Sequence, residues 1–277
     1  MDESELNLKT MKEIILLKLG GSLLTDKNTP NSIREDIVKN AVQQIIDANE
    51  QLILIHGGGS FGHPIARKYK ISKGKDISIK NQILGLTKTH QAMTNFNSFL
   101  VNSFIEKNYP VLSIQPSSIF IKDSDGISIQ SIDIIESSLN LNILPILYGD
   151  IILDKQLSFS IISGDQIIFE LCKHLKEFQV SKVIFTMETD GIFIKDKESS
   201  LPKLARNVHT RDLNSLNLAN LEQKIDVTGG IEGKINFIKQ ICDLEIPVQL
   251  INGLKDSYIY KSLKNQELNC TNILIDK

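Results

Sequence analysis

The sequence is poor in cysteine, and this scarcity excludes two kinds of stabilised fold. Among its 277 residues there are only three cysteines, Cys172, Cys242 and Cys270, and none forms a CxxC motif. An odd number of widely separated thiols argues against a disulfide framework and against a zinc site. We therefore expect free thiols in a cytoplasmic protein, and we assign no metal-binding side chains.

The sequence also lacks an excess of charge of either sign, and it lacks long apolar runs. The formal net charge is only −2 at pH 7, whereas nucleic-acid binders concentrate basic residues on one surface. No apolar stretch approaches the roughly 20 residues that span a bilayer. The acidic N-terminal residues 1–5 do not have the basic-then-apolar order of a signal peptide. We expect no nucleic-acid partner and no membrane partner.

What the sequence does contain is enough apolar residues, 41% of the chain, to fill one large core. Apolar runs predict strands at residues 13–19, 52–55, 111–114, 143–147, 180–185 and 248–251, and segments with helical spacing lie between them. This alternation favours a mainly parallel sheet with helices on both faces. We predict an α/β fold in one domain, residues 1–277, built as a three-layer α-β-α sandwich.

Several local signals refine this prediction. Ser32 is a candidate N-cap with Glu35 as its capping-box partner, and the triplet Ser163-Gly164-Asp165 opens another helix. A long helix is predicted over about residues 79–106. The short segments around Ile151 and Phe159 are predicted to pair as a hairpin.

A run of three glycines, Gly57–Gly59, follows the strand at 52–55 and precedes the start of a helix. Without side chains, backbone N–H groups can approach an anion closely, and the helix N-terminus adds positive potential. The pattern is typical of a phosphate-binding loop. The alternative is a tight strand-to-helix turn that only happens to be rich in glycine.

The same loop matches two known nucleotide motifs imperfectly. Residues 57–62 satisfy the dinucleotide pattern GxGxxG, with Asp76 as a possible ribose partner, so a nicotinamide-dependent oxidoreductase stays open as an alternative. The P-loop pattern requires a lysine where this chain has His63 and Ser or Thr where it has Pro64. We therefore do not expect a P-loop NTPase.

Two lysines lie next to loops of the predicted sheet edge. These loops are Gly20-Gly21, Gly57–Gly59, Ser163–Asp165 and Thr228–Gly230, and in open α/β sheets such loops gather at the carboxyl ends of the strands. Lys18 lies on a buried strand, where an ammonium group needs an anionic partner. Together with Lys234 it would supply two point charges to a phosphoryl group in transfer.

The order of these motifs resembles the amino acid kinase superfamily, and within it the isopentenyl phosphate kinases. The matching segments are KLGGS at 18–22, HGGGSFGH at 56–63, QPSS at 115–118, YGD at 148–150, ISGD at 162–165 and DVTGG at 226–230 with Lys234. The resemblance covers about residues 14–253. Phe61-Gly62-His63 after the glycines is the part that favours the isopentenyl phosphate branch.

The resemblance implies roles for individual residues. Lys18 would hold the transferring phosphoryl group, Asp165 would orient the lysines, and His63 would bind the acceptor phosphate. The implied catalytic residues are Lys18, Lys27, His63, Asp165 and Lys234. The implied ATP-binding residues are Lys18, Gly20, Gly21, Ser22, Gly59, Glu188, Asp190, Gly191, Phe193, Gly229 and Lys234. The implied acceptor-binding residues are Gly57, Gly58, Gly59, His63, Leu86, Met93 and Gly164.

The sequence departs from the family pattern at three positions. Glu188 replaces the first aspartate of the usual TDVDG segment, Gln166 replaces a second aspartate after Asp165, and Tyr148 stands where a histidine is common. The first departure affects the expected contacts with adenine or ribose. None of the three lies at the expected phosphoryl-transfer centre.

The resemblance implies an enzyme that phosphorylates isopentenyl phosphate to isopentenyl diphosphate with ATP and Mg²⁺. It further implies an acceptor lobe at about residues 12–155, a nucleotide lobe at about 156–277, and a homodimer. A fosfomycin-type kinase for another small phosphate or phosphonate is one alternative. A non-catalytic nucleotide-binding protein on the same fold is another.

Overall fold

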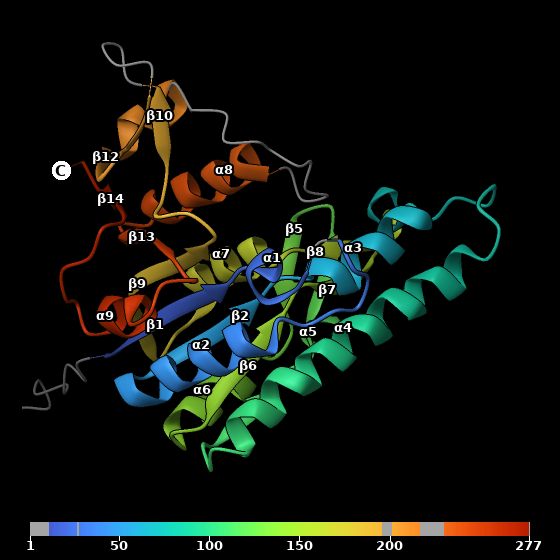
Figure 1. Cartoon of the computed structure of the whole chain (residues 1–277). Helices are drawn as coiled ribbons and strands as arrows, with labels where there is room; N and C mark the ends of the chain where they lie inside the picture. Colours follow the sequence, from blue (N-terminus) through green and yellow to red (C-terminus); the bar gives the residue numbers. More distant parts are fainter. Residues whose placement is uncertain (1–10, 27, 196–200, 217–229, 277) are drawn as a thin grey trace, which may run out of the picture.

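A sheet of eight strands forms the centre of the molecule (Figure 1). The computed structural model describes residues 11–26, 28–195, 201–216 and 230–276. From one edge to the other the strands are β12 (Asn207–His209), β14 (Thr271–Leu274), β13 (Val248–Asn252), β9 (Phe178–Met187), β1 (Lys12–Leu19), β2 (Leu52–His56), β6 (Leu144–Tyr148) and β3 (Val111–Ser113). All neighbouring strands are parallel except β13 and β14. The carboxyl ends of β1, β2, β6, β9 and β13 therefore share one edge.

Helices cover both faces of this sheet. One face packs against α2 (Glu35–Ala48), α4 (Gln82–Ile105) and α9 (Tyr258–Leu263), and the other against α6 (Ile132–Asn140), α7 (Gly164–His174) and α8 (Gly230–Cys242). Side chains of β1 alternate between these layers: Leu17 and Leu19 enter the first, Leu16 the second. The three-layer α-β-α sandwich predicted from the sequence is confirmed.

A smaller sheet lies beside the large one, with its strands in the order β5-β4-β7-β8. Strands β7 (Asp150–Asp154) and β8 (Ser158–Ile162) form the antiparallel hairpin expected around Ile151 and Phe159. Strands β4 (Phe120–Asp123) and β5 (Gly126–Ile129) were not predicted, although the dipeptide Asp125-Gly126 between apolar runs is a hairpin signal. A separate hairpin joins β10 (Phe193–Lys195) to β11 (Pro202–Leu204).

Two predicted helix starts have different outcomes. The Ser32 cap is wrong: α2 begins at Glu35, Arg34 occupies the N-cap position, and no side chain caps it. The carbonyl of Ser32 instead accepts the backbone N–H of Asp26 at 3.1 Å, which closes a loop ahead of the helix. The start of α7 is confirmed, because the hydroxyl of Ser163 accepts the N–H of Gln166.

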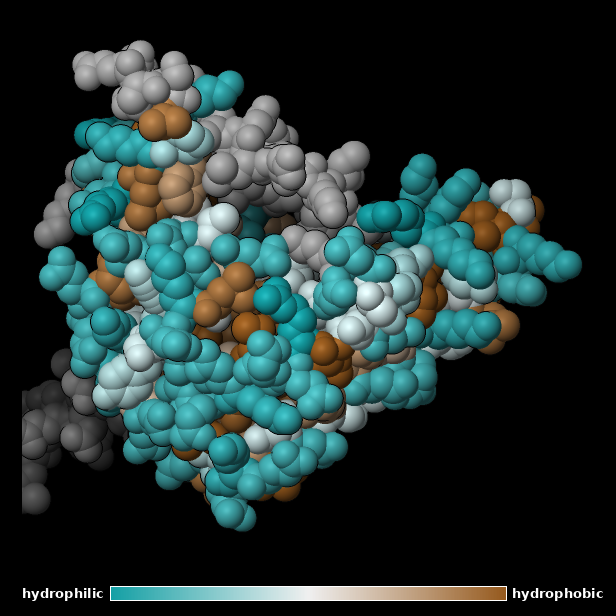
Figure 2. All heavy atoms as spheres, in the orientation of Figure 1, coloured by the Kyte–Doolittle hydropathy of each residue, from teal (hydrophilic) through white to brown (hydrophobic). Residues whose placement is uncertain are grey.

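The remaining helical elements are short or peripheral. They are α1 (Gly21–Leu24), α3 (Gly59–Lys68), α5 (Pro116–Ile119) and the 3₁₀ segments Ile71–Lys73 and Thr210–Ser215. Within the described ranges, no helix has the length and apolarity needed to cross a membrane. On the face shown in Figure 2, hydrophilic residues dominate and apolar residues gather in several small groups.

Candidate active site

Two glycine loops pack directly against each other at the carboxyl ends of β1 and β2. A methyl carbon placed on Gly21 would lie 2.3 Å from the backbone nitrogen of Gly59, and one on Gly57 would lie 2.8 Å from the nitrogen of Gly21. Gly59 also has a φ of +48°, a conformation that side chains disfavour. We call the five residues Gly20, Gly21, Gly57, Gly58 and Gly59 the glycine cradle.

Hydrogen bonds fix the cradle to the sheet and to itself. The N–H of Gly57 donates to the carbonyl of Leu19 at 3.1 Å, which ties the loop after β2 to the end of β1. The hydroxyl of Thr25 donates to the carbonyl of Gly21 at 2.8 Å and accepts the N–H of Ser60 at 2.9 Å. One threonine thus joins α1 to α3, so both helix N-termini lie beside the cradle with their positive ends fixed.

Three charged side chains meet beside this cradle. The ammonium of Lys18 forms an ion pair with Asp165, and that of Lys234 lies 3.1 Å from Asp165 Oδ1 and 3.4 Å from Oδ2. The Lys234 ammonium also lies 4.7 Å from the centre of the Phe185 ring. Strand β1 and helices α7 and α8 are distant in sequence, and they bring one carboxylate and two ammonium groups to one point.

The charge balance of this cluster favours anion binding. Burial raises the pKa of the Asp165 carboxyl, but the charges and hydrogen bonds of Lys18 and Lys234 outweigh burial and hold the pKa well below its ordinary value. Asp165 is therefore an anion that both lysines share. Two cations against one anion leave a positive charge that an incoming phosphate can neutralise.

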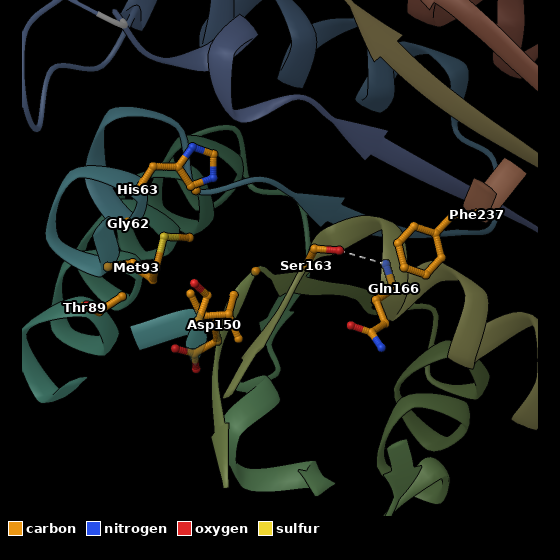
Figure 3. A pocket seen from close by; sticks show the side chains of 13 residues that line it. Gly62, His63, Thr89, Met93, Asp150, Ser163, Gln166 and Phe237 are labelled. Atoms are coloured by element: carbon orange, nitrogen blue, oxygen red, sulfur yellow. Dashed lines mark hydrogen bonds between the residues drawn. The ribbon is translucent and has the colours of Figure 1, made fainter. Parts of the chain in front are cut away.

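His63 lies next to Gly58 of the cradle, in the wall of a cavity of about 200 Å³. Gly58 lies close to both His63 and Met93: a methyl carbon on Gly58 would lie 3.3 Å from His63 Cδ2 and 3.3 Å from the Met93 sulfur. Figure 3 shows His63, Met93 and Thr89 on one side of this cavity and Gln166 and Phe237 on the other. The cavity thus combines a ring nitrogen with mostly small or apolar neighbours.

Of the other residues expected to bind the acceptor, some line the cavity and others do not. Met93 lines the cavity, whereas Leu86 packs in a small core cluster with Ile71 and is absent from the cavity wall. Gly164 lies at the start of α7, where a methyl carbon would come within 3.1 Å of Lys18 Cε. Gly164 therefore lets helix α7 approach the catalytic candidate Lys18 closely.

The residues expected to bind ATP fall into two groups. Gly20, Gly21 and Ser22 lie at the start of α1 in the cradle region. Glu188, Asp190, Gly191 and Phe193 follow the carboxyl end of β9, on the neighbouring part of the same sheet edge. Two expected residues, Lys27 and Gly229, lie outside the described residues.

The segment after β9 is held by residues far away in the sequence. Asp190 accepts hydrogen bonds from Asn252 at 3.0 Å and from Lys255 at 2.8 Å, and the Glu188 carboxylate lies 3.6 Å from the Arg34 guanidinium. Gly191, with a φ of +146°, packs against Thr271, where a methyl carbon would come within 2.3 Å of the hydroxyl.

His56, at the end of β2, is a buried structural residue. Its Nε2 lies 3.2 Å from Asn97 Oδ1 and its ring stacks on Tyr148 at 5.5 Å. Burial lowers the pKa of His56 to about 4, and hydrogen bonds to Gly57 and Asn97 only partly oppose this. The imidazole is therefore neutral at pH 7.

Several side chains of the site were not predicted from the sequence. Thr186, at the end of β9, donates to the carbonyl of Lys18 at 3.0 Å and accepts the N–H of Gly20 at 3.2 Å. Phe237 lines the cavity, and no local motif marks it. Asp150 also lines the cavity; it belongs to the Tyr148-Gly149-Asp150 segment at the end of a strand, but the resemblance assigned it no role.

Acidic and thiol side chains of the described residues form no group of three or more that could hold a metal ion. All three cysteines carry free thiols, and burial raises the pKa of Cys242 to about 12. The three cysteines therefore carry no catalytic thiolate at neutral pH.

Comparison with known proteins identifies relatives across nearly the whole chain. Residues 13–252 match the model of the amino acid kinase family. The chain is 37% identical over 261 residues to the isopentenyl phosphate kinase of Methanocaldococcus jannaschii, which covers 90% of this chain and 95% of that protein. It is 30% identical over 272 residues to the isopentenyl phosphate kinase of Methanothermobacter thermautotrophicus, which covers 94% and 98%.

A solved structure gives the same result for the fold. A crystal structure of an isopentenyl phosphate kinase superposes with a TM-score of 0.79 at 28% identity, and the match covers 94% of this chain and 100% of that one. The similarity therefore includes both halves of the central sheet.

Proposed function

The chain belongs to the amino acid kinase family, and we propose that it transfers the γ-phosphoryl group of ATP to isopentenyl phosphate, giving isopentenyl diphosphate. The observation that carries this proposal is the Lys18–Asp165–Lys234 cluster, in which one buried carboxylate holds two ammonium groups next to the glycine cradle. Relatives that share both halves of the chain bear the name of this activity.

Charge stabilisation and positioning would do most of the catalytic work. In phosphoryl transfer, negative charge spreads over the equatorial oxygens of the transferring group, and fixed cations stabilise it. Lys18 and Lys234 supply these cations, and Asp165 holds both ammonium groups in place before the substrates arrive. The acceptor is already a phosphate oxyanion, so the reaction needs no base to deprotonate it.

His63 would recognise the acceptor phosphate by donating a hydrogen bond to an oxygen that is not transferred. A phosphate dianion beside the imidazole favours its charged form and strengthens the bond. Gly57, Gly58 and Gly59 would lie between the donor and acceptor phosphates, and Gly58 and Gly59 would offer backbone N–H groups to them, since the N–H of Gly57 already donates to Leu19. Their contacts with Gly21 keep that backbone in one conformation.

The acceptor tail would occupy the cavity beside His63. Its volume, about 200 Å³, is below the roughly 300–1,000 Å³ of pockets that bind drug-sized ligands. Ala66, Met93 and Ile161 contribute apolar surface to its wall. Both features suit a short hydrocarbon tail.

ATP would lie on the opposite side of the cradle, with its phosphates near Gly20, Gly21 and Ser22 and its nucleoside toward Asp190, Gly191 and Phe193. Glu188 would take the place of the usual aspartate there. Mg²⁺ is expected to arrive bound to ATP, since magnesium is commonly held by substrate phosphates and the described residues offer no carboxylate cluster for it. We assign the acceptor lobe to about residues 12–155 and the nucleotide lobe to about residues 156–277.

We also expect a cytoplasmic homodimer. The free thiols suit a reducing compartment. Strand β3 ends the order of the large sheet, and its Leu112 is 41% exposed, so this edge offers a surface for a second copy. Sedimentation velocity would distinguish a dimer from a monomer.

A coupled assay of ADP release tests the proposed reaction. The acceptors would be isopentenyl phosphate, dimethylallyl phosphate, fosfomycin and glutamate, each at the same ATP and Mg²⁺ concentrations. We expect the highest kcat/KM with isopentenyl phosphate. Preference for fosfomycin would favour the phosphonate kinase, ATP binding without ADP release would favour a nucleotide-binding protein, and NADH binding would support an oxidoreductase.

A further inference from the structure

The wall of the acceptor cavity contains a carboxylate that the proposed reaction does not use. Asp150 lines the cavity at the start of β7, and its side chain is fully buried. In Figure 3 it lies between the α4 residues Thr89 and Met93 and the start of α7 at Ser163. An ionised carboxylate there is costly to bury and would repel a phosphate dianion in the same cavity.

His90 is the side chain that meets this charge. Its Nδ1 lies 2.9 Å from Asp150 Oδ1 and 3.0 Å from Oδ2, and the backbone N–H of Ile151 donates to Oδ1 at 2.8 Å. The hydrogen bond to Asp150 raises the pKa of His90, and partial burial of the ring opposes this only in part. When His90 is protonated, the two groups form an ion pair, and the raised pKa of His90 favours that form.

His90 is one of three polar residues, with Thr94 and Asn97, that form a row along α4. His90, Thr94 and Asn97 are spaced four and three residues apart, so they share one face of the helix. Thr94 hydrogen-bonds the side chain of Tyr148 at the end of β6. The row therefore attaches α4 to the strand ends that surround the site.

The other members of the row continue to the glycine loop. Asn97 contacts Nε2 of His56, the residue before Gly57, and donates to the hydroxyl of Ser113 at 2.6 Å. The same helix delivers Thr89 and Met93 to the cavity. The position of α4 thus determines the shape of the cavity wall, and it also supports the loop Gly57–Gly59.

We propose that His90 is a positioning residue that neutralises Asp150 in the cavity wall and so allows the cavity to accept a phosphate monoester dianion. The inference rests on the proposed function, because it takes the cavity to be the acceptor site. Asp150 secures α4 to β7 through His90, and His90 prevents Asp150 from repelling the acceptor. Neither side chain needs to touch the transferring phosphoryl group.

Charge removal in two steps tests this pairing. His90→Ala leaves the Asp150 charge without its imidazole partner, so we expect the KM for isopentenyl phosphate to rise about tenfold or more, with the KM for ATP within about twofold. Asp150→Asn removes the charge and retains the shape, so its acceptor KM should change less than about threefold. The double variant should recover most of the acceptor KM lost in His90→Ala.

Further variants keep the test decisive if His90→Ala folds poorly. His90→Gln retains a donor for Asp150 without the charge and should give an acceptor KM between those of the wild type and His90→Ala. His174→Ala is the matched control, since His174 pairs with Glu170 on α7 and does not line the cavity. An equal loss in the single and double variants, or an equal rise in the KM for ATP, would overturn the inference.

Failure of the proposed function has a different signature. If the wild type releases no ADP with isopentenyl phosphate, the proposed function is wrong. Calorimetric titration with inorganic phosphate then tests the pairing directly. Weaker phosphate binding in His90→Ala and recovery in the double variant would support it, and identical binding in all variants would overturn it.

Discussion

The cradle side and the proposed nucleoside side of the site are held by different kinds of interaction. In the cradle, backbone packs on backbone: Gly21 contacts Gly57 and Gly59 without any intervening side chain. In the segment after β9, charged side chains bridge distant segments, as Lys255 does with Asp190 and Arg34 with Glu188. The first kind is insensitive to salt, whereas exposed ion pairs are screened and contribute little.

This difference matches the tasks proposed for the two sides. Phosphoryl transfer needs donor and acceptor oxygens in line within a narrow tolerance, and a backbone without side chains supplies a fixed surface for them. The nucleoside needs only to be retained, so a segment held by exposed ion pairs is sufficient. Substitutions at the centre should therefore act on turnover or folding, and substitutions after β9 should act mainly on the KM for ATP.

Lys18→Met should show the largest effect. It removes the buried cation that contacts Asp165, and we expect kcat to fall about 1,000-fold while far-UV circular dichroism stays unchanged. Lys255→Met is the matched control, because it removes an exposed lysine paired with Asp190 on the nucleotide side. Near-normal turnover in Lys18→Met would show that the cluster is not the transfer centre.

The contrast between the two sides also explains what the sequence could predict. The alternation of apolar runs was sufficient for the three-layer sandwich, and the spacing of glycines was sufficient to place Gly21 and Gly57 at one sheet edge. Glycine patterns are local: where the fold requires backbone without side chains, a cluster of glycines appears within a short segment of the sequence.

Contacts between segments that are distant in the sequence could not be predicted in this way. Nothing near Thr186 indicates that it bridges Lys18 and Gly20, and nothing near Asp150 indicates His90 as its partner. Leu86 and Met93 both fit helical spacing, and only the path of α4 decides that Met93 reaches the cavity. Ser32 matches a capping pattern, yet it does not cap α2; its carbonyl instead accepts the N–H of Asp26, which closes a loop.

Gly21→Ala should show the next largest effect. The added methyl would lie 2.3 Å from the Gly59 nitrogen, so the two loops must separate, and we expect a loss of about 1–3 kcal/mol in the free energy of unfolding. Urea denaturation measures it. Gly149→Ala is the control, since its nearest neighbour would lie at 3.5 Å, an ordinary contact. Equal losses in both variants would contradict the direct packing of the loops.

The pH dependence of stability should show the smallest effect. The pKa of His56 is about 4 in the fold against 6.5 in the unfolded chain, so the unfolded state binds more protons between these values and stability falls as pH falls. His56 should account for about 1 kcal/mol of the loss in unfolding free energy between pH 7 and 5.5. His56→Phe should have a shallower dependence than the wild type, and equal slopes would refute the assignment.

The most direct test is the pair of Michaelis constants in two variants, one from each side of the site. His63→Ala should raise the KM for isopentenyl phosphate about tenfold and leave the KM for ATP within about twofold. Asp190→Ala should do the reverse, with the acceptor KM nearly unchanged. If each variant raises both constants equally, the division into an acceptor side and a nucleotide side around the Lys18–Asp165–Lys234 cluster is wrong.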